Sequence, residues 1–263
     1  MLIDELIQLN ARIPSCDLIN SKKFLLKSDF VETCAEFVEE ESFTETMQQM
    51  AKLPFGKETH VFELQRPTYA TGEQTDVVTF ICKEIDIDDQ PHIQVHYLVG
   101  KRLFPFISLF NPKEIERHPT GELSLPFRTK TTRGEPVRMG SMSPESELRI
   151  LSGAITLSSI LAVLNSPKII DTIDVNNDSW NAKRRKHGQK TLHNHTVVFI
   201  KKDIAEAVRL QNEGRSIELD SHGKRIHWRR GHFKHRATGT FWWSATLVGS
   251  GTNLIEKRYD VNA

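Results

Sequence analysis

The spacing of apolar residues in the first fifty positions is typical of helices. Apolar side chains recur on one face of a 3.6-residue period at Phe30, Val31, Cys34, Phe37 and Val38. Ser28 stands where the N-cap of this helix is expected. A second short helix is predicted after Ser42, because Ser42 and Glu45 form a capping-box pattern. Pro54 and Gly56 are expected to end it.

From residue 59 onward the pattern changes to that of strands. The runs 59–65, 77–85 and 92–100 are rich in Val, Ile, Phe and Tyr, and the acidic turn 86–91 separates the last two. We therefore expect an antiparallel meander. Residues 105–142 lack a clear period and are rich in Pro, Gly and Thr, which predicts an irregular excursion and a domain boundary.

A longer helix is predicted over residues 143–165. Ser143 is placed as its cap, Pro144 lies in its first turn, and Glu145 and Glu147 lie near the positive end of the helix dipole. Its later turns are apolar almost all round, which is typical of a helix in the middle of a core. The apolar part is shorter than the roughly 20 residues that a bilayer requires, so we expect no membrane role.

The rest of the chain is predicted to mix both kinds of element. A short basic helix is expected at 179–188, ended by Gly188, and another helix at 203–214. Strands are expected at 168–175, 195–201, 224–236, 240–249 and 253–261. The predicted fold class is α+β, with N-terminal helices, an antiparallel sheet, a central buried helix and a C-terminal β-hairpin or meander. Its predicted parts are an N-terminal α+β region, 1–140, and a basic C-terminal α+β module, 141–263. The second part is either a separate domain or packed with the first as one globular unit.

Composition and charge restrict the cellular setting and the partner. Asp4 and Glu5 stand where a signal peptide would be basic. The three cysteines, Cys16, Cys34 and Cys82, form no C-x-x-C pair and no disulfide framework, so a reducing cytosol is expected. Residues 151–263 hold 18 Lys and Arg against 10 Asp and Glu, although the whole chain carries a net charge of only +1. An anionic partner would therefore bind the C-terminal part.

Two basic segments are candidates for that partner's binding site. The stretch 222–236, HGKRIHWRRGHFKHR, contains six Lys and Arg and four His without an acidic residue. The run 183–186, KRRK, is the second. Arginine supplies a bidentate fork for phosphate oxygens and an aromatic ring offers a platform for bases. The predicted nucleic-acid-binding residues are Lys183, Arg184, Arg185, Lys186, Arg225, Trp228, Arg229, Arg230, Lys234 and Arg236.

Histidines in the stretch 222–236 raise the questions of a metal and of catalysis. In a strand, His227 and His235 lie on the order of 26 Å apart, too far for one ion, so no metal site is predicted. Histidine titrates near neutral pH, so His227, His232 and His235 are candidate acid and base groups of a metal-independent ribonuclease, with neighbouring arginines stabilising charge. Gly231 decides between two geometries: a bulge there would allow His227 and His232 to share one face, whereas a regular strand would not.

The C-terminal residues resemble a group of uncharacterised proteins of bacteriophages and prophages. The resemblance lies in the blocks 164–175, 181–192, 227–249 and 255–261, and its centre is the His-x-Arg-Arg-Gly-His motif at 227–232. It implies a phage setting, and hence the cytosol of a bacterial host. It transfers no activity and no functional residue.

Two functions follow as hypotheses. The first is a phage-type protein that binds RNA or DNA through its basic, His- and Arg-rich C-terminal hairpin; in a stronger form of this hypothesis the protein is also a metal-independent ribonuclease. The alternative is a non-enzymatic accessory protein that binds and modulates a host or defence protein, in which the basic hairpin is structural and its arginines pair with the acids of residues 28–45. The chain contains none of the dinucleotide, P-loop, nucleophile-elbow or HExxH motifs, so no cofactor is expected.

Overall fold

The computed structural model describes residues 13, 16–64, 78–99, 102–138, 140–166 and 169–201, together with six short strands between residues 217 and 256. In those six strands, side chains are described for Phe233 and Lys234.

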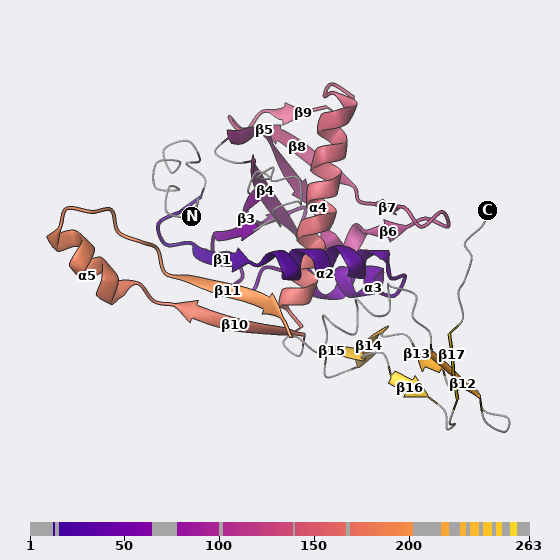
Figure 1. Ribbon diagram of the computed structural model, residues 1–263. Helices are drawn as coiled ribbons and strands as arrows, with labels where there is room; N and C mark the ends of the chain where they lie inside the picture. The colour runs from indigo at the N-terminus through magenta and orange to yellow at the C-terminus, as the bar shows by residue number, and fades with distance from the viewer. Residues whose placement is uncertain are drawn as a thin grey trace.

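A nine-stranded mixed sheet forms the centre of the molecule (Figure 1). Its strands follow the order β10-β11-β1-β2-β3-β4-β5-β8-β9. Strand β1 is parallel to both of its neighbours, β2 and β11, while the other pairs are antiparallel. The bounds are β1 Lys22–Leu26, β2 His60–Leu64, β3 Val78–Ile87, β4 Gln90–Val99, β5 Arg102–Phe110, β8 Phe127–Thr131, β9 Pro136–Val137, β10 Ile170–Val175 and β11 His195–Ile200.

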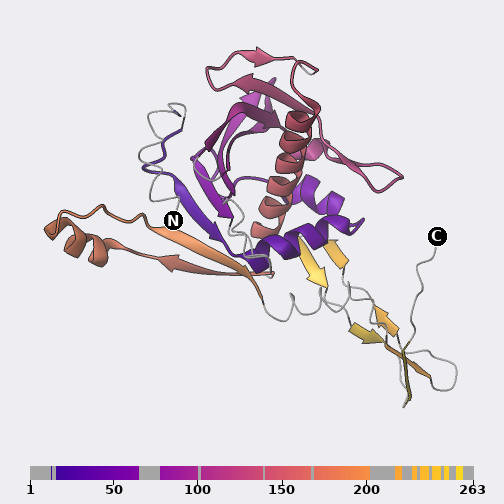
Figure 2. The same cartoon turned by 45° about the horizontal axis from the view of Figure 1, so that its top comes forward.

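Three helices, α2 (Ser28–Glu39), α3 (Phe43–Met50) and α4 (Pro144–Leu164), cover one face of this sheet (Figures 1 and 2). Phenylalanines on the facing helix and strand surfaces, Phe30, Phe37, Phe43, Phe62 and Phe110, are almost fully buried between them. Such rings contribute the largest apolar areas in a core, so this contact is the main hydrophobic core. A smaller cluster covers the other face, where Ile13, Cys16 and Leu18 pack on Val61, Ile81 and Leu98.

Short elements complete the fold. A 3-10 turn, η3 (Pro112–Glu114), and the hairpin β6 (Glu116–Arg117) with β7 (Leu123–Ser124) follow β5, and α5 (Asp178–Lys186) lies between β10 and β11. The C-terminal strands pair as β12 with β17, β13 with β16 and β14 with β15. Their bounds are β12 Ile217–Asp220, β13 His227–Arg229, β14 His232–Arg236, β15 Gly239–Trp243, β16 Thr246–Val248 and β17 Asn253–Glu256.

The α+β class predicted from the sequence is confirmed, and so are its most periodic elements. The antiparallel meander is present as β2 to β5, and Asp88 and Asp89 adopt φ values of 52° and 59° in the tight acidic turn between β3 and β4. Ser143 caps α4 by accepting a hydrogen bond from the backbone of Ser146. The capping-box prediction is wrong: Ser42 has helical dihedrals and its side chain makes no cap bond.

Two segments differ from the sequence prediction. Residues 22–26 lie in a stretch that appeared helical, yet β1 pairs on both sides with other strands of the sheet. A run of five residues is too short for its period to distinguish strand from helix. Residues 105–142 were expected to be irregular, but β5 and β8 continue the sheet there. Strands from both sides of the predicted boundary at residue 140 thus pair in one sheet.

Helix α4 is long and apolar enough to meet a length criterion for crossing a membrane. Half of its most apolar window is buried within the protein, and its later turns, from Leu157 to Val163, lie in the main core. The expectation of a central buried helix agrees with this placement.

Candidate functional site

A two-stranded arm, residues 170–200, projects from the edge of the sheet (Figures 1 and 2). Strands β10 and β11 pair in an antiparallel register from Ile170 opposite Ile200 to Val175 opposite His195. Helix α5 lies at the outer end of this arm. The predicted run 183–186 forms the last turn of α5, and we call it the basic turn.

The basic turn presents positive charge to solvent. Lys183, Arg185 and Lys186 are exposed, whereas Arg184 is half-buried and donates from Nε to the carbonyl of Lys190. Cations at a helix C-terminus also interact favourably with the helix dipole. Gly188 ends the helix with φ of +62°, a left-handed conformation that favours glycine. The predicted stop at this residue is confirmed.

Asparagine side chains fix α5 against the returning chain. The amide of Asn181 donates to the carbonyl of Leu192 and accepts from its N–H, both at 2.7 Å. Asn177 donates from Nδ2 to the carbonyl of His193 at 2.8 Å. Both asparagines are buried. Because these bonds join the helix to the segment that leads into β11, the basic side chains extend from a backbone held in one position.

Trp180 is a surface residue that sequence reasoning missed. Its side chain is 62% exposed, and Lys183 Nζ lies 5.7 Å from the centre of its ring. The available sequence signal was the spacing of three residues between Trp180 and Lys183, which brings the two side chains together on a helix surface. An exposed indole beside four cations adds a stacking surface to the basic turn.

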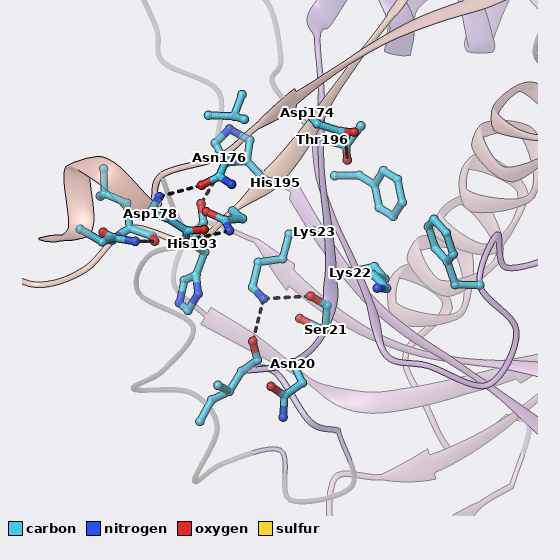
Figure 3. A pocket seen from close by; sticks show the side chains of 17 residues that line it. Asn20, Ser21, Lys22, Lys23, Asp174, Asn176, Asp178, His193, His195 and Thr196 are labelled. Carbon is cyan, nitrogen blue, oxygen red and sulfur yellow. Dashed lines mark hydrogen bonds between the residues drawn. The ribbon is translucent and has the colours of Figure 1, made fainter.

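A pocket of about 610 Å³ lies where the arm leaves the sheet (Figure 3). We call it the arm-base pocket. One wall consists of residues 19–24 at the start of β1, with Phe55 beside them. The other wall consists of the end of β10, the first turns of α5 and residues 192–196. Asp178 and Asn181 line the pocket, and the basic turn begins two residues after Asn181, so the two features adjoin on one helix.

Lys23 is the most deeply buried cation of the arm-base pocket. Only 6% of its surface is exposed, and Nζ donates to the carbonyls of Ile19 and Ser21 at 3.1 and 2.9 Å (Figure 3). Burial lowers the pKa of Lys23 from its usual value, an effect that the carboxylate of Asp17 partly opposes. An ammonium has three donors, so these two bonds leave one N–H for a further acceptor.

Lys22 and Phe55 also line the arm-base pocket. Lys22 Nζ is 5.3 Å from the centre of the Phe55 ring and 3.5 Å from a carboxylate oxygen of Glu58. The Phe55 side chain is 52% exposed. Its backbone N–H donates to Nε2 of His60, whose Nδ1 lies 2.8 Å from the carbonyl of Glu58. Burial lowers the pKa of His60, which favours the neutral ring that this pair of bonds requires.

The remaining polar groups of the arm-base pocket come from the arm. His195 Nδ1 lies 3.1 Å from the carbonyl of His193. Asp174 accepts from the hydroxyl of Thr196 at 2.7 Å, and Asp178 accepts from the amide of Asn194 at 3.3 Å. The pocket therefore combines lysines on the sheet side with hydrogen-bonded carboxylates and imidazoles on the arm side.

In the second predicted segment, residues 222–236, the described side chains are those of Phe233 and Lys234, and Phe233 lies in the core. Phe233 in β14 is 4% exposed and contacts Phe37 edge-on and Phe43 at a tilt, with ring centres 5.1 and 4.9 Å apart. Strand β14 thus packs on α2 and α3. Lys234, the next residue, is partly exposed.

The predicted strand over 224–236 occurs as two described pieces, β13 and β14. Arg229 pairs with Thr246, and His232 pairs with Trp243. Gly231 lies outside the described residues, so the choice between a bulge and a regular strand at this position stays a prediction.

Other predicted residues of this segment are described in part or not at all. The backbones of His227, Trp228, Arg229, His232, His235 and Arg236 lie in β13 and β14, but their side chains are outside the description. Arg225 and Arg230 lie outside the described residues. The ribbons of helix α5 and of the strands β13 to β16 lie apart from each other in Figures 1 and 2.

The comparisons with known proteins show no family for this chain. No family model and no curated protein matches the sequence. Among solved structures, the chain aligns with one titled "Crystal structure of AcrVA2" at 13% identity and a TM-score of 0.30, covering 87% of this chain and 72% of that one. A TM-score this low carries no conclusion about fold or function.

Proposed function

We propose that the protein binds nucleic acid through the basic turn of α5. The observation that carries the proposal is the run of cations Lys183 to Lys186, three of them exposed, at the outer end of the arm on a helix held by Asn177 and Asn181. Phosphate contacts from Lys and Arg supply most of the affinity of sequence-independent binding. Trp180, exposed beside Lys183, supports the same function because bases stack on aromatic rings.

The basic residues of β13 and β14 extend this proposal as a second contact with the same polymer. Arg229 and Arg236 and the flanking Arg225 and Arg230 remain predicted phosphate contacts. Cleavage of RNA by His227, His232 and His235 also remains a prediction.

Charge reversal tests the proposal. The double variant Lys183→Glu/Arg185→Glu changes two exposed side chains and should weaken binding of a labelled RNA about tenfold or more, since both lost phosphate contacts become repulsions. Fluorescence anisotropy of the full chain measures this. The matched control is Lys130→Glu/Arg133→Glu, two exposed cations around the turn between β8 and β9. Equal affinities for the two double variants and the unaltered protein would reject the basic turn as the interface.

A second candidate function is the accessory protein that binds a host or defence protein. The packing of Phe233 against Phe37 and Phe43 favours it, because a structural role for the C-terminal hairpin is what this hypothesis requires. A pull-down from host lysate with and without nuclease treatment separates the two. A specific protein partner that survives nuclease supports the second function, and loss of all partners with nuclease supports the first.

A further inference from the structure

The arm-base pocket adjoins the basic turn, so its chemistry bears on which nucleic acid the protein takes. A volume of about 610 Å³ lies within the range of roughly 300–1,000 Å³ that small-molecule pockets occupy. This is room for one nucleotide unit or for a ligand of similar size. The pocket opens beside the first turns of α5, where Asp178 and Asn181 belong to its wall.

Two aromatic side chains, each with a lysine over its ring, lie in or next to the arm-base pocket. Phe55 and Lys22 line the pocket on the sheet side. Trp180 with Lys183 lies on α5, within the turn that contributes Asp178 and Asn181 to the other wall. Both rings are more than half exposed, at 52% and 62%. Exposed rings beside mobile ammonium groups are suited to stack bases while the lysines contact neighbouring phosphates.

The pocket offers polar contacts on both sides of β1. On the side of Phe55, Lys22 offers its ammonium to a phosphate, and Asp174, which accepts from the hydroxyl of Thr196, offers further lone pairs to the amino group of a base. Lys23 and Asp178 lie on the other side of β1 (Figure 3). There Lys23 has one N–H beyond its bonds to Ile19 and Ser21 for an anionic oxygen.

We propose that the arm-base pocket receives an unpaired nucleotide, stacked on Phe55, and that the ligand of the basic turn is therefore a single-stranded nucleic acid. This inference rests on the nucleic-acid binding proposed above. A duplex holds its bases in an internal stack, so it could contact the cations of the basic turn but could not place a base on Phe55. His60 fixes the position of Phe55 by accepting from its backbone N–H, which prepares the platform before binding.

The test compares a labelled single-stranded RNA with the same strand annealed to its complement, by anisotropy with the full chain. Phe55→Leu keeps an apolar side chain and removes the ring. It should weaken single-strand binding about fivefold to a hundredfold, because stacking on one aromatic ring contributes on this scale. Duplex binding should be unchanged. Phe55→Trp should restore single-strand binding. Leu148→Ala, which alters an exposed apolar residue of α4 away from this pocket, is the control.

A second variant protects the test against an effect on folding. Lys22→Gln changes a side chain that is 45% exposed and should weaken single-strand binding without changing the thermal unfolding temperature. If both Phe55→Leu and Lys22→Gln bind the single strand as the unaltered protein does, while Lys183→Glu/Arg185→Glu abolishes binding, the pocket proposal fails and the basic turn stands. If the double reversal leaves both RNAs bound as before, the proposed function itself fails.

Discussion

At the scale of the residue, His96 shows how burial in the sheet controls a proton. The side chain is 3% exposed on β4, and the amide of Gln94 lies 3.1 Å from its Nε2. Among the described residues, Nδ1 of His96 has no hydrogen-bond partner. Burial lowers the pKa of His96 from 6.5 to about 4, so the folded protein holds this ring neutral.

The free energy of unfolding should consequently depend on pH through His96. Between pH 6.5 and about 4 the unfolded chain binds a proton that the folded protein does not, so stability falls as the pH is lowered across this window. The loss attributable to His96 is about 3 kcal/mol, from about 1.4 kcal/mol for each pKa unit. His96→Gln should remove that part. Urea unfolding of both proteins at several pH values measures it, and identical pH profiles would contradict the account.

At the scale of the element, the contact of α4 with the sheet depends on Gly153. A Cβ atom at this position would lie 2.6 Å from Cε1 of Tyr97, whose ring is buried and whose hydroxyl is hydrogen-bonded to Ser108. Gly153→Ala should therefore destabilise the protein by about 1–3 kcal/mol, because either the ring or the helix must move. Ser152→Ala, one position away and exposed, should change stability by less than about 0.5 kcal/mol. Equal melting temperatures for the two variants would refute the close approach.

The attachment of α5 to its arm is a second property at this scale. Asn181→Ala removes both bonds to the backbone of Leu192 and leaves two polar groups without that partner. Local opening of residues 178–192 should become easier by about 1–3 kcal/mol. Hydrogen exchange of the Leu192 amide, which donates to Asn181, reports this directly. Ser179→Ala on the exposed face of α5 is the control, and unchanged exchange in Asn181→Ala would show that the asparagine does not hold the helix.

Some elements of the fold are marked by local sequence signals, whereas others depend on residues far apart in the chain. The amphipathic period of α2, the cap of α4 and the glycine stop of α5 are local signals, and each helix was predicted within a few residues. The position of β1 between β2 and β11 is not local, because it depends on residues about 170 positions apart. The same is true of the arm-base pocket, which is lined both by residues 19–24 and by residues 174–196 of the arm. The spacing of neighbours in the chain carries no signal for such a meeting.

At the scale of the whole molecule, Phe233 joins the C-terminal strands to the helical face of the sheet. The sequence hid this role, since basic residues alternate on both sides of Phe233 and gave neither face of the strand an apolar character. Phe233→Ala should cost about 3–5 kcal/mol, as for other buried phenylalanines. Leu148→Ala, at an exposed position, should cost far less. Chemical denaturation compares the two, and a cost no larger than that of the control would contradict the packing of β14 on α2 and α3.

The separation of charge across the whole molecule leads to the most direct test of the account. Excess positive charge lies in the C-terminal part of the chain. The basic turn at the end of the arm carries four of these cations. Each phosphate contact contributes about 0.7 to the slope of log affinity against log salt concentration for a single strand.

The decisive measurement is therefore that slope, for a single-stranded RNA, with the unaltered protein and with Lys183→Glu/Arg185→Glu. Nucleic-acid binding by the basic turn predicts a steep slope for the unaltered protein. In the double variant the slope should become smaller by about 1.4, because two phosphate contacts of about 0.7 each are lost. A flat salt response, or the same slope for both proteins, would contradict nucleic-acid binding by the basic turn.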